Sequence, residues 1–225
     1  MSRLTPIAFE ATDLDAMEAA KGRIVIIVTP EGKLDPSARR ANRLTKGAVA
    51  RLVASDRFSK AKSGQVISLA WPTGLAAEAL DVLVLDRKIS AVDARKAGAA
   101  LAKLKGSKPL TVMTGGMRKA AELALGIALR DYRFDAYKSK DDDTPDESAP
   151  VTFYHTNAED VSAAAAPLLA VAEGAHTAPV LAKAARGAGI EMPIVDAVVA
   201  LLQERADVAT VIDRLMTRPL KSEHG

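Results

Sequence analysis

The sequence predicts an α/β protein, and two observations carry that prediction. Short β-branched runs alternate along the chain with segments in which apolar residues have helical spacing. Apolar residues make up 48% of the chain but aromatic residues only 4%, so the core has to be built from Ala, Val, Leu and Ile. Alternation of this kind indicates a parallel or mixed sheet that is covered by helices.

Six segments have the length and composition of strands. The clearest is continuously apolar and β-branched from Ile24 to Val28, and Pro30 stops it shortly afterwards. Another ends at Pro72, and a third leads into Gly115 and Gly116. The strands are expected at residues 6–9, 23–29, 65–71, 81–86, 109–113 and 151–155.

Helices are expected between and after these strands, mainly from their start signals. Asp35 and Pro36 are an N-cap and a first-turn residue, and Ser90 with Asp93 has the spacing of a capping box. The last fifty residues carry helical patterns and no strand signal. The helices are expected at residues 13–20, 35–55, 90–104, 120–130, 158–173, 177–188, 193–203 and 208–216, and Gly47 punctuates the second of them.

Composition excludes several classes of protein. The chain has no Cys, which rules out disulfides, thiolate metal ligands and a Cys nucleophile. A net charge of +3 over 225 residues is mildly basic, well short of a dedicated nucleic-acid binder. No apolar run reaches membrane-spanning length, and the first residues lack the apolar core of a signal peptide. We therefore expect a bacterial-type cytoplasmic protein with no membrane partner.

An apolar helix at residues 120–130 leads into an aromatic and cationic segment. Tyr132, Phe134 and Tyr137 occur within six residues, in a chain that has three Tyr and four Phe. This order resembles the end of the N-terminal domain of leucyl (cytosol) aminopeptidases, and the resemblance covers residues 1 to about 174. It implies a three-layer α/β domain similar to the macro domains, and the three aromatic side chains are expected to pack against its core.

A second resemblance begins near Val171. Residues 171–182, 189–198 and 215–223 resemble the C-terminal domain of NAD(P)-dependent glycerol-3-phosphate dehydrogenases. In that family the residues at the positions of Val171 and Glu173 contribute to the cofactor pocket, so the resemblance makes these two the candidate cofactor-binding residues. The expected domains are residues 1–174 and 175–225, and the chain looks like a chimera. A natural fusion, a recombination, an engineered join or an assembly error would each explain it.

The catalytic machinery of both resembled families is missing from the sequence. Two-metal aminopeptidases hold their ions with convergent carboxylates and a Lys around an Asn-Thr-Asp-Ala-Glu-Gly-Arg-type motif, which does not occur here. The Gly-x-Gly-x-x-Gly dinucleotide fingerprint is also absent. His155, His176 and His224 lack a second His at helical spacing, and His155 is interpreted as a capping or surface residue. We expect no catalytic residue, no metal site and no bound cofactor.

Two features leave binding functions open. Gly115 and Gly116 lie between a strand and a helix, where backbone N–H groups can hold a phosphate, so a nucleotide or ADP-ribose ligand is one alternative. A row of cations on one helix is typical of a solvated face, and weak, salt-sensitive nucleic-acid binding is its alternative. These cations are Arg39, Arg40, Arg43, Lys46 and Arg51. The acidic stretch at residues 138–150 is interpreted as a solvated loop.

The function expected from the sequence is that of a non-catalytic assembly or regulatory domain of the aminopeptidase type, joined to a dehydrogenase tail. The alternatives are a fragment of a metal-dependent leucyl aminopeptidase, a fragment of an NAD(P)-dependent glycerol-3-phosphate dehydrogenase, and a nucleotide- or DNA-binding module. Residues 1–170 contain every strand signal and are expected to fold alone. The tail is expected to self-associate or to dock on the first domain, because short isolated helices are marginal in water.

Overall fold

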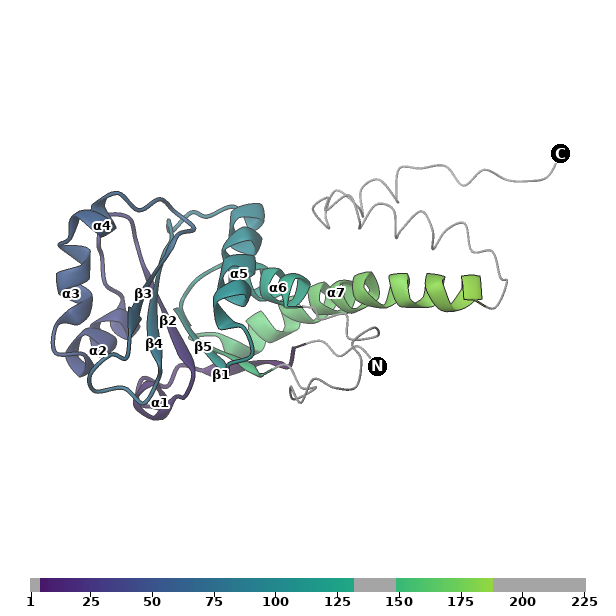
Figure 1. Ribbon diagram of the computed structural model, residues 1–225. Coiled ribbons are helices and arrows are strands. Elements are labelled where there is room, and N and C mark those ends of the chain that lie inside the picture. The colour runs from purple at the N-terminus through teal and green to yellow at the C-terminus, as the bar shows by residue number, and fades with distance from the viewer. Residues whose placement is uncertain (1–4, 132–148, 188–225) are drawn as a thin grey trace. The chain divides into compact units, whose positions relative to one another are not determined.

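The computed structural model describes residues 5–131 and 149–187. The chain divides into two compact units, residues 1–170 and 171–225. The first unit contains one sheet of six strands (Figure 1). The strands are β1 (Ile7–Ala11), β2 (Arg23–Val28), β3 (Val66–Ala70), β4 (Ala79–Val84), β5 (Leu110–Gly115) and β6 (Val151–His155).

The order of the strands across the sheet is β1-β6-β5-β2-β4-β3. Strand β3 pairs antiparallel with β4, and the other neighbouring pairs are parallel. The prediction of a mixed α/β sheet is therefore confirmed. Strands β2, β4 and β5 are adjacent and parallel, so their carboxyl ends lie at the same edge of the sheet.

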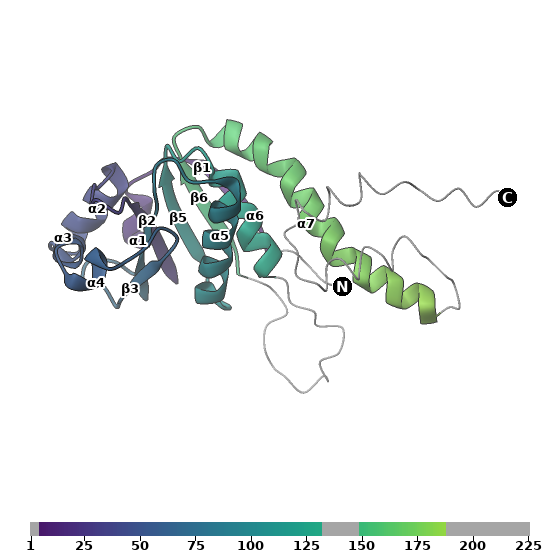
Figure 2. The ribbon, with the colours of Figure 1, turned by 90° about the horizontal axis from the view of Figure 1, so that it is seen from above.

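Helices cover both faces of the sheet, which gives three layers (Figure 2). Alternate residues of β2 point to opposite faces. Ile24 and Ile26 pack with residues of α2, α3 and α4, whereas Val25 packs with residues of α5 and α6. The helices are α1 (Ala16–Ala19), α2 (Pro36–Leu44), α3 (Ala48–Val53), α4 (Asp56–Ser59), α5 (Ala91–Lys105), α6 (Ala120–Arg130) and α7 (Ala158–Gly187).

A buried carboxylate ties three strands together at the start of β2. Asp81 on β4 is fully buried, and both its oxygens accept hydrogen bonds from the Arg23 guanidinium, at 2.8 and 2.7 Å. The Ser68 hydroxyl on β3 donates to the same carboxylate at 2.5 Å. Because a buried charge is costly unless it is paired, this bidentate contact specifies the register of β2, β3 and β4.

Helices α5 and α6 cross at two glycines. A Cβ placed on Gly98 would lie 2.1 Å from the carbonyl oxygen of Leu123, and one placed on Gly126 would lie 2.0 Å from that of Arg95. Neither distance leaves room for a methyl group, so the close approach of the two backbones depends on both glycines. An ion pair of 2.7 Å between Arg95 and Glu122 lies beside the crossing.

A second buried ion pair joins the C-terminal ends of the same helices. The Nζ atom of Lys105, at the end of α5, lies 2.6 Å from an Asp131 carboxylate oxygen just after α6. The Thr5 hydroxyl donates to the same oxygen. Lys105 is only 1% exposed, so this ion pair offsets part of the cost of burying its charge.

Several predicted boundaries are wrong. The helix predicted at residues 35–55 is two helices, α2 and α3, because Gly47 adopts a left-handed conformation with φ +85° between them. The strand predicted at residues 81–86 begins and ends two residues earlier, as β4. The helices predicted at residues 158–173 and 177–188 are one helix, α7, which continues through Gly174.

A glycine in a helix costs only about 1 kcal/mol relative to Ala, and the Ala- and Leu-rich flanks of Gly174 favour the helix. The helices predicted at residues 193–203 and 208–216 lie outside the described residues. So do Tyr132, Phe134, Tyr137 and the acidic residues 141–147.

Candidate functional site

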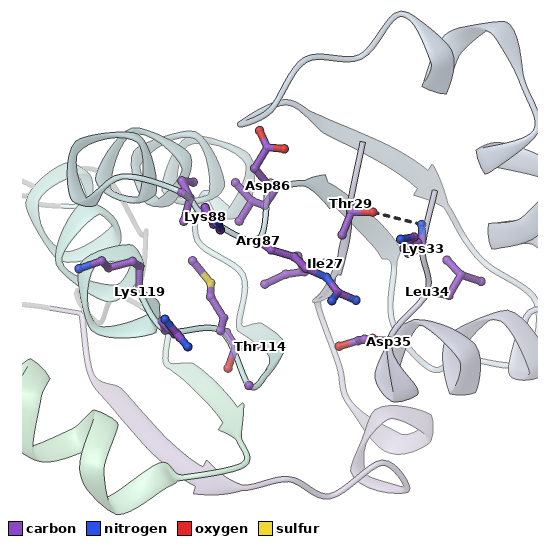
Figure 3. Close-up of a pocket in the computed structure, with 15 residues that line it drawn as sticks. Ile27, Thr29, Lys33, Leu34, Asp35, Asp86, Arg87, Lys88, Thr114 and Lys119 are labelled. Atoms are coloured by element: carbon purple, nitrogen blue, oxygen red, sulfur yellow. Dashed lines mark hydrogen bonds between the residues drawn. The ribbon is translucent and has the colours of Figure 1, made fainter. Parts of the chain in front are cut away.

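A pocket of about 740 Å³ opens at the carboxyl ends of β2, β4 and β5. The chain leaves β2 towards α2 on one face of the sheet, whereas it leaves β4 and β5 towards α5 and α6 on the other. Diverging loops of this kind leave a crevice in open α/β sheets, where ligands commonly bind. We call it the carboxyl-edge pocket, and Figure 3 shows the residues that line it.

The loop after β2 supplies one side of the carboxyl-edge pocket. The Thr29 side chain accepts a hydrogen bond from the backbone N–H of Lys33 at 3.2 Å, drawn as a dashed line in Figure 3. A hydrogen bond from the same Thr29 side chain lowers the pKa of Glu31. Leu34 forms a bridge back to Val28. These contacts hold Lys33, Leu34 and Asp35 in a compact turn at the edge of the sheet.

Asp35 is both the N-cap of α2 and a wall of the carboxyl-edge pocket. One carboxylate oxygen accepts a hydrogen bond from the N–H of Ala38 at 2.7 Å. The other lies 2.8 Å from where a Cβ on Gly115 would be. Burial raises the pKa of Asp35, and the hydrogen bonds from Ala38 and Ser37 oppose that rise. Gly115 has φ +54°, so this tight approach needs a residue without a side chain.

The loop between β5 and α6 supplies the opposite side, and the end of β6 holds it in place. The Thr114 hydroxyl donates to the Tyr154 carbonyl at 2.9 Å, and the Gly115 carbonyl accepts from the Thr156 N–H at 2.9 Å. His155 completes the attachment: its Nδ1 accepts from the Asn157 N–H at 2.9 Å.

The other ring nitrogen of His155, Nε2, lies 3.1 Å from the Met117 carbonyl. Because Nδ1 is an acceptor here, a neutral ring carries its proton on Nε2 and donates to Met117. His155 is only 6% exposed, so the interpretation of a surface residue is wrong, while a capping contact beside α7 is present.

Basic side chains dominate the charged lining of the carboxyl-edge pocket. Figure 3 shows Lys88 and Lys119 on one side of the opening and Lys33 on the other. Within the part of the chain that the structure describes, none of the basic lining residues forms an ion pair. The basic lining residues are Lys33, Arg87, Lys88, Arg118 and Lys119, and the acidic ones are Asp35 and Asp86.

The structure places the predicted phosphate-binding glycines beside this pocket, although not at a helix N-terminus. Gly115 is the last residue of β5, and α6 begins only at Ala120. Gly116 lines the carboxyl-edge pocket and is exposed. The predicted cofactor-binding residues, Val171 and Glu173, are both exposed on α7. They belong to the second unit and to no pocket described above, so a cofactor role for them stays a prediction.

Sequence reasoning missed the charged residues of the carboxyl-edge pocket. A usable signal was present, because the predicted strands at residues 81–86 and 109–113 are each followed closely by a basic dipeptide, Arg87-Lys88 and Arg118-Lys119. The row of cations that the sequence places along the α2 region does not line the carboxyl-edge pocket. Arg40 pairs with Asp15 at 2.9 Å, and the others are exposed.

Among residues 5–131 and 149–187, no group of three or more His, Cys, Asp or Glu side chains is arranged to hold a metal ion. The same residues contain no helix long and apolar enough to cross a membrane.

Comparison with known proteins identifies the family. The family model for the cytosol aminopeptidase N-terminal domain matches residues 25–141. The chain belongs to the cytosol aminopeptidase family through this domain. It is 46% identical over 174 residues to a probable cytosol aminopeptidase of Dinoroseobacter shibae and 38% identical over 174 residues to one of Cereibacter sphaeroides. Each alignment covers 77% of this chain but 35% of the relative, so the chain spans about a third of their length.

A separate, shorter match involves another protein. Over 54 residues the chain is 59% identical to a glycerol-3-phosphate dehydrogenase [NAD(P)+] of Novosphingobium aromaticivorans. The aligned residues are 24% of this chain and 16% of that enzyme. Both predicted resemblances are therefore confirmed.

Among solved structures, the macro domain of ganglioside-induced differentiation-associated protein 2 is similar, with a TM-score of 0.47 and 15% identity. That similarity covers 73% of this chain and 84% of the macro domain.

Proposed function

We propose that residues 1–170 form a non-catalytic domain that assembles with, or regulates, a peptidase of the cytosol aminopeptidase family. The observation that supports this is the extent of the alignment. The matched residues are 77% of this chain, yet they cover only 35% of the relatives named as probable aminopeptidases. The catalytic residues of those relatives are then expected in the part of their sequences that this chain does not match. We also propose the cytoplasm as the compartment, because the relatives are named cytosol aminopeptidases.

The catalytic part of the proposal is tested with a chromogenic leucine amide in the presence of Mn²⁺ or Zn²⁺. We expect no metal-dependent hydrolysis above a blank taken through the same purification. Turnover that depends on the metal and follows the protein through chromatography would contradict the non-catalytic role.

The assembly part is tested by co-expressing this chain with the Dinoroseobacter shibae relative, to which it is 46% identical. Native mass spectrometry is expected to show mixed oligomers that contain both chains. Only homogeneous species of each protein, under conditions where the relative itself assembles, would exclude this mode of assembly.

We further propose that residues 171–225 promote self-association. The support is their similarity to a segment that forms only 16% of a dehydrogenase, so the greater part of that larger protein has no counterpart in the match. Sedimentation of the full chain and of a truncation at Ala170 separates the outcomes. A larger species is expected only for the full chain, and two monomers would contradict the proposal.

Weak nucleic-acid binding is a further proposal about partners, and it rests on exposed cations around α2 such as Arg39 and Arg43. Binding of a labelled DNA duplex should then weaken steeply as salt is raised. Binding that does not change with salt, or that is absent at low salt, would contradict it.

A further inference from the structure

We propose that the carboxyl-edge pocket binds a small organic phosphate, which is a phosphate or diphosphate group carried on an apolar or heteroaromatic body. This inference goes beyond the assembly role and does not depend on it, because it concerns a pocket formed within residues 27–119 of this chain.

The charge of the carboxyl-edge pocket selects an anion. Its lining contains five Lys and Arg side chains and two carboxylates, an excess of three positive charges. The formal net charge of all 225 residues is also +3, so the charges of the remaining residues balance one another and the excess equals that of the pocket lining. Clustered charge of one sign in a crevice raises the local concentration of ligands with the opposite charge.

The uncharged lining shows that a bare inorganic anion would leave most of the carboxyl-edge pocket unused. Apolar side chains from all three loops contribute, including Leu34, Leu85 and Met117, and Ile27 adds to them from β2. A volume of about 740 Å³ falls in the ~300–1,000 Å³ range of small-molecule pockets. The lining therefore fits a ligand with an apolar or aromatic body and one strongly anionic end.

The loop that carries Arg118 and Lys119 is fixed by hydrogen bonds within the protein, without a ligand. Thr114, Gly115 and Met117 are each hydrogen-bonded to residues at the end of β6 or just beyond it. Within the described residues, the backbone N–H groups of Arg118 and Lys119 make no hydrogen bond to another backbone group. These N–H groups are therefore not committed to the backbone, and a pre-formed loop lowers the ordering cost of binding.

Asp35 opposes the same ligand. Its carboxylate lines the pocket and burial raises its pKa, so the negative charge there is already unfavourable before an anion binds. Asn is as good an N-cap as Asp, so Asp35→Asn keeps the start of α2 while it removes this charge. A phosphate-binding pocket should therefore gain affinity from this substitution, which an unspecific loss of structure would not produce.

The experiment is isothermal titration calorimetry of the full 225-residue chain at constant ionic strength. The probes are adenosine diphosphate, inorganic phosphate and adenosine. We expect adenosine diphosphate to bind most tightly, phosphate more weakly, and adenosine without measurable heat. This order distinguishes an organic phosphate from a free anion and from an uncharged apolar ligand.

Variants then locate the binding. Arg118→Gln and Arg87→Gln should each weaken binding of adenosine diphosphate by about ten- to a hundredfold, the effect of removing one hydrogen bond to a charged group. Arg57→Gln is the matched control, because Arg57 is an exposed cation on α4 that does not line the pocket, and it should change the affinity less than about twofold. Asp35→Asn should tighten binding by about two- to fivefold. Circular dichroism checks that each variant is folded.

Three results would overturn the proposal. The first is an absence of binding by adenosine diphosphate at millimolar concentration. The second is an equal loss in Arg57→Gln and Arg118→Gln, which would mean diffuse attraction to surface charge. The third is adenosine binding as tightly as its diphosphate. Failure of the aminopeptidase assembly experiment would leave these outcomes unchanged, because the titration uses this chain alone.

Discussion

The crossing of α5 and α6 offers the sharpest test of how this domain is held together. Gly126→Ala places a methyl group 2.0 Å from the Arg95 carbonyl oxygen, and Gly98→Ala places one 2.1 Å from that of Leu123. In both cases the obstacle is backbone, which cannot rotate away as a side chain can. The helices have to separate until the 2.0 Å distance approaches the 3.4 Å of an ordinary van der Waals contact, a shift of roughly 1.4 Å.

Two opposing effects set the size of the loss. Overpacking a tight contact costs about 1–3 kcal/mol and sometimes more, and an obstacle made of backbone favours the upper end. Ala also stabilises a helix by about 1 kcal/mol relative to Gly. We therefore expect either substitution to lower the free energy of unfolding by about 2 kcal/mol, which is the upper end of the overpacking cost less the gain from Ala. At about 2–4 °C per kcal/mol, this corresponds to several degrees in Tm.

Urea unfolding followed by far-ultraviolet circular dichroism measures this effect. The matched control is Gly174→Ala, because Gly174 also lies inside a helix but a Cβ there would meet nothing within 4 Å. It should cause no loss and should gain up to about 1 kcal/mol in α7. A variant Gly98→Ala or Gly126→Ala that is as stable as the wild type would show that the backbones of α5 and α6 do not approach this closely.

Three further predictions follow from other sites. Lys105→Met should cost about 3–5 kcal/mol because the buried Asp131 carboxylate loses its ion pair with Lys105, and adding Asp131→Leu should recover most of that loss in a double-mutant cycle by urea unfolding. The raised pKa of Asp35 means that its contribution to stability is present below the unfolded pKa, near 3.8, and is lost as pH rises through the folded value. Asp35→Asn should therefore gain stability relative to the wild type across that window, and a constant difference from acid to neutral pH would contradict it. Gly115→Ala should cost at least about 1–2 kcal/mol, because φ is +54° and the methyl group would meet Asp35, while Gly116→Ala, which meets nothing, should be neutral in thermal unfolding.

The local pattern of the sequence was enough to predict the six strands of the first unit and most of its helices, but not the short helix α4. Residues 151–155 form a strand with the predicted bounds, and Ser90 caps α5 by accepting a hydrogen bond from the Asp93 N–H at 3.1 Å. Such signals involve only a few neighbouring residues, so they can be recognised without knowledge of the fold. Gly47 was recognised as an interruption, but one helix was predicted through it, because only the φ value distinguishes a helix end there from a tolerated glycine.

The candidate site could be predicted only in part. Gly115 and Gly116 were identified because a glycine pair after a strand is a local signal. The basic residues around them come from three loops that follow β2, β4 and β5, and nothing in the linear order says that β2 lies between the other two strands. The burial of His155 was not predicted for the same reason, since its partner Met117 is 38 residues away along the chain.

By itself, the sequence determined the α/β class, the two families that the chain resembles, and the glycine turn at Gly115. The periodicity of apolar residues, the composition and the short motifs are properties of neighbouring residues, so they can be recognised without knowing which distant residues they contact. Only the tertiary structure decided the strand order, the burial of Lys105 against Asp131, and the gathering of cations at one edge of the sheet. These features depend on contacts between distant residues, which the packing of helices on both faces of the sheet brings together.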